Sequence, residues 1–367
     1  MFKFRLKSLF ILAISFLLIF LASSYKGVTE LVYTNFLNRI LRENLSYLSW
    51  KLSIPIGDVL NIVLIVLIIL IFMSVIRNLS NSDNILHSCY KLIWFVINML
   101  AIVIFSYIFL YGLNYHTRPL QTVITKLYEE KYATTVNVNV DNGTMVNVFK
   151  NLEQKALDTK RLANSVNENY SINNLTNLSI QADKGFRLIA DKFPMMYGNY
   201  SPAKVSLESG LMSYFGMDGR YYMLTNEVTI NKNVPKIYLP FIVSKYMAYQ
   251  RGAAKEDEAS FYAFLACTSN TSPEFKYSGY IAALYNLLNT LRVYDKIDYN
   301  NIIETINPDL KKDINTIQKY VDTYGSGTVF KDRFMNSFKR INGDIRYEPT
   351  NYEFSILICT YYSVFSF

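Results

Sequence analysis

The chain contains very little histidine. Only His87 and His116 occur among 367 residues, and residues 117–367 contain none. Histidine is the most common metal ligand and a frequent catalytic base, so its absence disfavours many enzyme classes for the C-terminal two thirds. Cysteine is also scarce, with 3 residues, which excludes a small fold built on disulfides. The net charge of +8 comes without any Arg/Lys-rich run, so nucleic acid is not expected as a partner.

Charged residues make up only 18% of the chain, whereas 51% of its residues are hydrophobic. The mean hydropathy of +0.12 is too high for an ordinary soluble enzyme and too low for a chain that lies entirely in the membrane. Aromatic residues account for 15%, which excludes a disordered chain. This composition predicts a few membrane spans joined to a soluble domain.

Three apolar stretches, all in the first third, predict transmembrane helices at about 9–23, 59–76 and 92–113. The second and third contain no charge and are long enough to cross about 30 Å of hydrocarbon. The first stretch is shorter and follows a basic start, so a cleaved signal peptide is an alternative to a retained span. The lipid bilayer is therefore an expected partner.

Basic residues at the N-terminus predict the orientation. Lys3, Arg5 and Lys7 precede the first apolar stretch, which favours a cytoplasmic N-terminus. With three spans, the large C-terminal part then lies outside the cytoplasm. We therefore divide the chain into a membrane domain, 1–113, and an extracytoplasmic domain, 114–367.

The second domain has the patterns of a mainly α fold with a small sheet, an α+β arrangement. Helices are predicted from apolar periodicity and end signals at 145–168, 182–193, 239–252, 255–268, 277–291, 308–324 and 353–365. Residues 221–230 are rich in aromatic and β-branched residues and predict a strand or hairpin. The Asn-rich segment 167–179 is expected to be a loop.

The segment LPFIVSKYMAYQRGAAKEDEASFYAFLACTSN, residues 239–270, carries a family resemblance. It resembles the central stretch of a bacterial membrane family, the domain-of-unknown-function family numbered 3810, which reads like L-P-F-x-x-x-H-E-x-A-H-Q-R-G-x-x-x-E-D-E-A-N-F. The three N-terminal spans and the junction GLNYHTRPL, residues 112–120, also fit the layout of that family. The resemblance implies a zincin-like metallopeptidase fold, in which two His one helical turn apart and a later Glu bind zinc and the Glu after the first His activates water.

This chain departs from that pattern at every ligand and base position in the helix. Lys245 and Tyr249 stand at the two His positions, and Tyr246 stands at the general-base position, so H-E-x-x-H becomes Lys245-Tyr246-Met247-Ala248-Tyr249. The flanking residues Ala248, Gln250, Arg251 and Gly252 still match, which fixes the register. An ammonium repels Zn²⁺ and a protonated phenol is a poor ligand, so we expect no zinc, no other cofactor and no intact catalytic residue.

The helices predicted at 239–252 and 255–268 are expected to meet at a bend near Gly252. The acidic residues after this bend have two interpretations. Glu256, Asp257 and Glu258 can simply stabilise a solvated helix N-terminus. Alternatively, Glu256 occupies the third-ligand position, and Lys245 supplies the positive charge that the metal would have carried. Glu258 is the alternative carboxylate for this role.

These observations predict a catalytically inactive, zinc-metallopeptidase-like membrane protein. Its expected role is to bind a peptide or protein, or to regulate a partner. The alternative function is that of an active membrane-anchored peptidase with an unrecognised metal site or a replacement chemistry.

Overall fold

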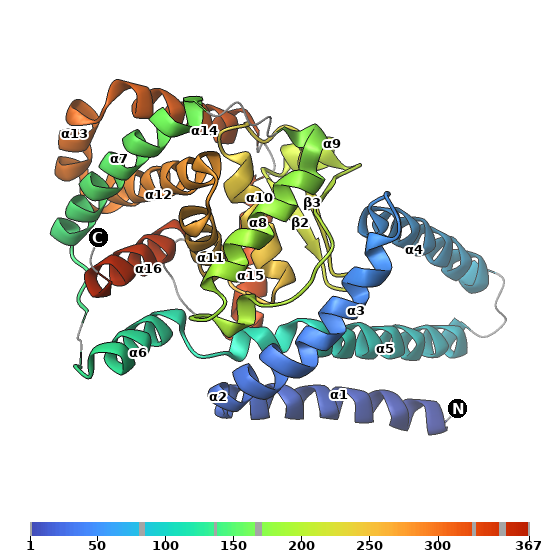
Figure 1. The fold of residues 1–367 in the computed structure, drawn as a ribbon. Coiled ribbons are helices and arrows are strands. Elements are labelled where there is room, and N and C mark those ends of the chain that lie inside the picture. The colour runs from blue at the N-terminus through green and yellow to red at the C-terminus, as the bar shows by residue number, and fades with distance from the viewer. Residues whose placement is uncertain are drawn as a thin grey trace.

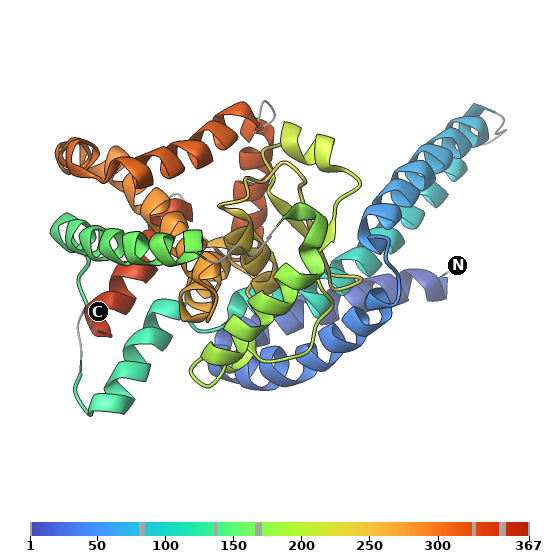
Figure 2. The same cartoon turned by 45° about the horizontal axis from the view of Figure 1, so that its top comes forward.

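The computed structural model describes residues 2–80, 85–135, 138–165, 171–324, 328–344 and 350–365. The fold is mainly helical with one small three-stranded sheet, as the sequence predicted (Figure 1). Long apolar helices project from one side of a larger helical part, which holds the sheet and the C-terminal helices (Figure 2).

The three predicted apolar helices are present. They are α1 (Phe2–Ser24), α4 (Ile56–Ser80) and α5 (Ile85–Leu110), and each contains a segment long and apolar enough to cross a membrane. Helix α5 ends three residues before the predicted boundary at 113, because the short 3-10 helix η2 (Gly112–His116) follows it. Helices α1 and α5 pack against each other, whereas the apolar stretch of α4 is exposed along its length.

The segment between α1 and α4 is helical over nearly its whole length. It consists of α2 (Lys26–Val28), the π-helix η1 (Thr29–Leu37) and α3 (Asn38–Trp50). Sequence analysis assigned this segment to the membrane domain and predicted no helix in it. In the structure it packs on the larger part, since the Ser46 hydroxyl on α3 donates to Ser201 Oγ at 3.0 Å.

The larger part contains these helices: α6 (Leu120–Tyr132), α7 (Asn142–Ser165), η3 (Ile172–Asn174), α8 (Leu175–Ile189), η4 (Pro194–Met196), α9 (Ser209–Tyr214), α10 (Leu239–Gln250), α11 (Glu256–Ser269), α12 (Pro273–Tyr294), α13 (Lys296–Thr305), α14 (Pro308–Thr323), α15 (Thr328–Ile341) and α16 (Thr350–Val364). Several boundaries have a local cause. Proline occupies the first turn of α10, α12 and α14, where its missing N–H leaves no hydrogen bond unmade.

Helices α11 and α12 form the centre of the core. Helix α12 packs on α7 and α16, and α11 packs on α8, α10 and α16. Their side chains are buried on nearly all sides, as Phe261, Phe264 and Leu284 show with no exposed surface. Gly185 on α8 lies directly against the backbone of Ala266, where a Cβ would collide with the carbonyl oxygen. Close backbone contact therefore holds α8 against α11.

The helix predicted at 182–193 begins and ends earlier in the chain than expected. Helix α8 begins at Leu175, so most of the expected loop 167–179 that the structure describes is helical, and the helix ends at Ile189 rather than at 193. Leu175, Leu178 and Phe186 are buried along one face, and this packing overrides the loop propensity of the asparagines. Residues 166–170 of the expected loop lie outside the described residues.

The sheet has the order β1-β3-β2, with β1 at Lys204–Val205, β2 at Gly219–Tyr222 and β3 at Glu227–Ile230. Strands β2 and β3 form the predicted hairpin, which pairs Gly219 with Ile230 and Tyr222 with Glu227. Strand β1 runs parallel to β3 on its other side. Both β2 and β3 contact α10, so the sheet lies beside the helix that carries Lys245, Tyr246 and Tyr249.

Candidate functional site

The candidate site is formed where α10 and α11 meet. The chain ends α10 at Gln250, turns through residues 251–255 and begins α11 at Glu256, so the predicted bend is present. Gly252 makes the turn with a φ of +103°, a value that other residues rarely adopt. A Cβ at Gly252 would also lie 1.8 Å from Nη1 of Arg42 on α3. The positive φ therefore favours glycine at this position, and the Arg42 guanidinium occupies the space beside it.

The two residues before Gly252 hold the bend in place. Gln250 is fully buried and its Nε2 donates to the carbonyl oxygens of Asn226, at 2.9 Å, and Ser201, at 3.1 Å. Arg251 is also fully buried and donates to Asp183 Oδ1 at 2.5 Å and to the Met196 carbonyl at 3.1 Å. Burial lowers the pKa of Arg251 although Asp183 opposes this change. The Gln-Arg-Gly run is thus structural in this chain.

Lys245 and Glu256 lie together across the bend. The Lys245 ammonium donates to Glu256 Oε1 at 2.8 Å. The side chain of Lys245 is 12% exposed and that of Glu256 is 38% exposed, so the pair sits at a partly open surface. Burial alone would lower the pKa of Lys245, but the carboxylates of Glu256 and Asp218 outweigh burial and raise it. Lys245 therefore carries a positive charge at neutral pH.

Tyr246 and Tyr249 flank this ion pair, with ring centroids 5.7 Å apart. Burial raises the pKa of both phenols well above the usual value, and Glu256 raises each further. Both tyrosines are therefore protonated at neutral pH. Gly219 at the start of β2 lies close to the Tyr246 ring, where a Cβ would approach it to 2.6 Å. The absence of a side chain at Gly219 lets the strand lie directly over the site.

Glu258 is directed to a different partner. Its Oε1 accepts from the Lys255 ammonium at 2.9 Å, three residues earlier in the same turn. Both side chains of this second pair are largely buried. The structure thus brings Glu256, and not Glu258, to Lys245. Asp257, the third acid of the run, is also buried.

The residues at this site do not fit zinc. They offer one ammonium, two protonated phenols and one carboxylate that already accepts from the ammonium. Within the described part of the chain, no group of three or more His, Cys, Asp or Glu is arranged to hold a metal. Cys267 on α11 lies 3.4 Å from the Ser244 hydroxyl, and burial raises the pKa of its thiol to about 12. This thiol is therefore protonated and enclosed in the core.

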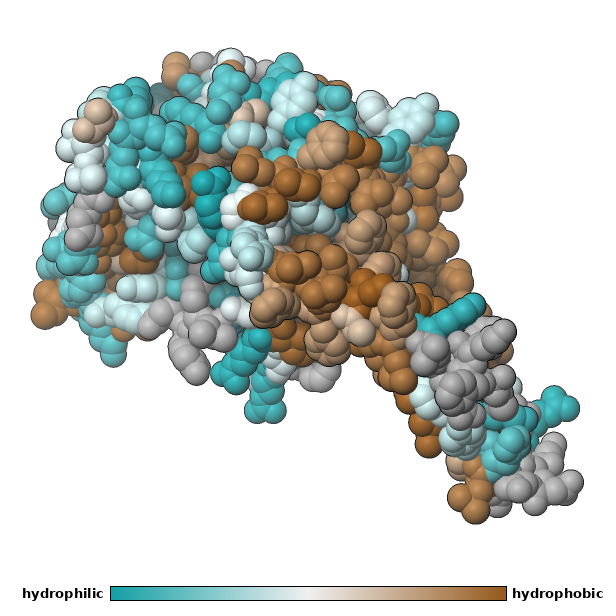
Figure 3. Space-filling view, turned by 90° about the horizontal axis from the view of Figure 1, so that it is seen from below, coloured by the Kyte–Doolittle hydropathy of each residue, from teal (hydrophilic) through white to brown (hydrophobic). Residues whose placement is uncertain are grey.

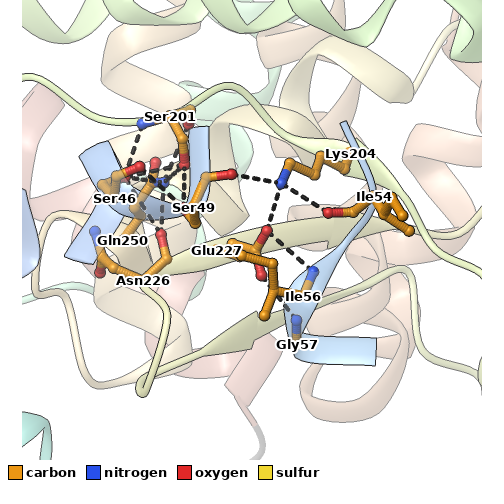
Figure 4. Close-up of polar contacts among 10 residues, drawn as sticks. All are labelled: Ser46, Ser49, Ile54, Ile56, Gly57, Ser201, Lys204, Asn226, Glu227 and Gln250. Atoms are coloured by element: carbon orange, nitrogen blue, oxygen red, sulfur yellow. Dashed lines mark hydrogen bonds and ion pairs between the residues drawn. The ribbon is translucent and has the colours of Figure 1, made fainter. Parts of the chain in front are cut away.

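A second polar cluster joins the sheet to the start of α4 (Figure 4). The Glu227 carboxylate on β3 accepts from the backbone N–H of Ile56 at 3.2 Å and of Gly57 at 2.8 Å. The Lys204 ammonium on β1 donates to Glu227 Oε1 at 2.5 Å and to the carbonyls of Ser49 and Ile54. Since a helix N-terminus favours a negative charge, Glu227 ties the sheet to the first turn of an apolar helix.

Sequence reasoning missed this second cluster entirely. Lys204 and Glu227 lie 23 residues apart and contact residues about 150 to 170 positions earlier in the chain. No motif marks either residue. Only the short apolar pattern around β3 indicated that Glu227 would be on a strand, and it gave no reason to expect a buried charge there.

Lys245→Ala is expected to lower the free energy of unfolding by about 1–2 kcal/mol. A fully buried pair would lose about 3–5 kcal/mol, but Glu256 is 38% exposed and water screens its charge. Chemical denaturation of the purified protein in detergent measures this effect. Lys245→Met is the comparison, because it keeps most of the stem and loses the charge. A loss below about 0.5 kcal/mol in both variants would mean that the pair is not stabilising.

Comparison with known proteins gives one match. Residues 33–346 match the protein family described as "Protein of unknown function (DUF3810)". This region includes α3, the apolar helices α4 and α5, the sheet and the whole of the α10–α11 bend. No curated protein and no solved structure matches the chain.

Proposed function

The chain belongs to the DUF3810 family, and we propose that this member is a membrane-anchored, non-catalytic relative of zinc metallopeptidases. The observation that carries the proposal is the Lys245–Glu256 ion pair, 2.8 Å long, at the junction of α10 and α11. In an H-E-x-x-H protein, the first His and the later Glu would hold the metal between these two helices. Here an ammonium provides the positive charge that the carboxylate requires.

The ammonium can replace only one of the two roles of a metal ion. A bound zinc ion neutralises its ligands and also lowers the pKa of a water molecule, which then attacks the substrate. Lys245 neutralises Glu256 but has no open coordination position. Tyr246 stands where the general base would be, and its raised pKa keeps it protonated. On this proposal, the site keeps the charge balance of a metallopeptidase site without its hydrolytic chemistry.

An extended peptide segment is the ligand that this arrangement favours. Strand β2 is at the edge of the sheet, so within the described residues no strand pairs with its outer side. Gly219 places this strand against Tyr246, next to the ion pair. A peptide can add to a strand edge that no other strand occupies, through main-chain hydrogen bonds, and leave its side chains to contact the neighbouring surface. We therefore propose a peptide, or an extended segment of a partner protein, as the ligand.

The test combines metal content, hydrolysis and binding. The purified chain should contain far less than one zinc ion per molecule by mass spectrometry and should not hydrolyse a mixture of fluorogenic peptides when Zn²⁺ is added. A labelled pool of random peptides should bind, and methylation of alternate backbone amides should abolish this binding. Stoichiometric zinc together with chelator-sensitive hydrolysis would overturn the proposal, as would peptide binding that survives amide methylation.

We also propose that residues 114–367 lie outside the cytoplasm. The basic N-terminus and the odd number of candidate spans support this orientation. External protease should therefore digest this domain in intact protoplasts, as detected with an antibody to a C-terminal tag. Protection of the domain under conditions that cleave an extracellular control protein would show the opposite orientation.

A further inference from the structure

The helical segment between α1 and α4, residues 26–50, has its polarity reversed. Its buried residues are almost all polar and follow one face: Thr29, Tyr33, Thr34, Asn38, Arg42, Ser46 and Ser49. Its exposed residues include many large apolar side chains: Val28, Leu31, Val32, Phe36, Leu37, Ile40, Tyr47, Leu48 and Trp50. We call this second set the outer face. A helix on a water-soluble protein shows the opposite arrangement.

The buried polar side chains of this segment donate hydrogen bonds to the end of α5 and to the residues just beyond it. The Tyr33 hydroxyl donates to the Phe109 carbonyl at 2.6 Å, and Asn38 Nδ2 donates to the Leu110 carbonyl at 2.9 Å. The Thr34 hydroxyl donates to Asn114 Oδ1 at 2.9 Å, just beyond α5. The last carbonyl groups of a helix have no partner within it. The segment therefore supplies hydrogen-bond donors to a helix end that would be costly to leave unpaired in an apolar environment.

The large apolar side chains of the outer face are more exposed than is usual for a surface in contact with water. Leu31 is 63% exposed, Leu48 is 62% exposed and Trp50 is 59% exposed. Contiguous apolar patches of this kind mark contacts with a protein or a membrane. The brown apolar surface in Figure 3 extends beyond the projecting helices onto the adjoining body, whereas the opposite end of the molecule is mostly teal.

The position in the chain identifies what covers this face. Residue 26 follows the end of α1 by two residues, and Trp50 precedes the start of α4 by six. The segment is thus joined at both ends to helices that are apolar enough to cross a membrane. Near α4 it ends in Tyr47 and Trp50, and the ammonium of Lys51, the next residue, lies 4.7 Å from the centroid of the Tyr47 ring. Such aromatic and basic residues are typical of the interface between lipid and water.

We propose that residues 26–50 lie in the leaflet of the bilayer nearest the larger part, with the outer face against the lipid acyl chains. The segment is then a membrane-embedded element that does not cross the bilayer, and its polar face packs against the larger part. This polar face reaches the α10–α11 bend, because Arg42 touches Gly252 and Ser46 contacts Gln250. The candidate site is thereby held at the membrane surface.

The position of Trp50 provides a direct test, since the chain has only one other tryptophan, Trp94. The Trp94→Phe variant, reconstituted in phosphatidylcholine vesicles, leaves Trp50 as the sole tryptophan. Phospholipids brominated on the acyl chain near the headgroup should reduce its fluorescence about twofold or more, because the ring lies within the lipid. Aqueous iodide should have little effect on it.

The matched control moves the tryptophan to the far side of the molecule. In the Trp50→Phe/Trp94→Phe/Ile297→Trp variant, the new ring replaces a side chain that is 76% exposed on α13. Iodide should quench this ring and brominated lipid should not. Quenching of Trp50 by iodide alone would overturn the proposal. Protection of Trp50 from both quenchers would also overturn it and would assign the outer face to a second copy of the chain.

Discussion

Replacing Glu227 with alanine is expected to destabilise the protein by about 3–5 kcal/mol. The Glu227 side chain is 1% exposed and that of Lys204 is 11% exposed, so the pair lies away from water. Removal of the carboxylate leaves the Lys204 ammonium buried without its counter-charge. It also removes the acceptor for the N–H groups of Ile56 and Gly57 at the start of α4. The free energy of unfolding in detergent, measured by chemical denaturation, checks this expectation.

The control is a carboxylate–cation pair whose two side chains are exposed to solvent. Asp158 and Arg161 are 3.8 Å apart, and their side chains are 57% and 79% exposed. Asp158→Ala should therefore change stability by less than about 0.5 kcal/mol. The loss of stability caused by Glu227→Gln should lie between the losses for Glu227→Ala and Asp158→Ala, because an amide oxygen still accepts a hydrogen bond but carries no charge. A loss for Glu227→Ala as small as that for Asp158→Ala would show that the cluster does not stabilise the fold.

Introducing an H-E-x-x-H motif into α10 should produce stoichiometric zinc binding. The triple variant Lys245→His/Tyr246→Glu/Tyr249→His places two imidazoles one turn apart on α10, the spacing that binds zinc in H-E-x-x-H proteins. We expect Glu256 to serve as the third ligand, since its Oε1 lies 2.8 Å from the present Lys245 ammonium. Zinc content by mass spectrometry should rise to about one ion per chain, and added zinc should raise the melting temperature of this variant but not that of the unmodified protein.

Two further substitutions identify the third ligand. Adding Glu256→Gln to the triple variant should abolish zinc binding, because the amide is a far weaker ligand. Adding Glu258→Gln should leave zinc binding intact, because Glu258 is paired with Lys255. If the second change and not the first removes zinc, Glu258 is the carboxylate that faces the site. A triple variant that is folded but binds no zinc would count against the zincin-like geometry itself.

Local residue patterns were sufficient to predict much of the helical structure. The apolar runs specified α1, α4 and α5, because about 20 apolar residues in sequence have no other common arrangement. Proline and glycine marked the ends of α10, and the acidic run marked the start of α11. A bend near Gly252 was predicted because a straight helix would separate residues 249 and 256 by about 10 Å, too far for both to reach one site.

Sequence patterns also limited the chemistry of the candidate site. Residues 245, 246 and 249 are Lys, Tyr and Tyr, and no histidine follows residue 116. The sequence could not decide whether Glu256 or Glu258 pairs with Lys245, because both acids lie in the first turn of α11. Only the direction in which each side chain leaves that turn assigns Glu256 to Lys245 and Glu258 to Lys255.

The sequence by itself determined the apolar helices, the α10–α11 bend and the lack of histidine in α10, because each depends on residues close together in the chain. Tertiary structure alone decided how the larger part is fixed to the apolar helices. Glu227 meets the start of α4, and Arg42 fills the space beside Gly252, through contacts between residues about 170 and 210 positions apart. Local propensity cannot specify such contacts, because a buried charge has no periodic pattern and depends on partners that only the folded chain brings together.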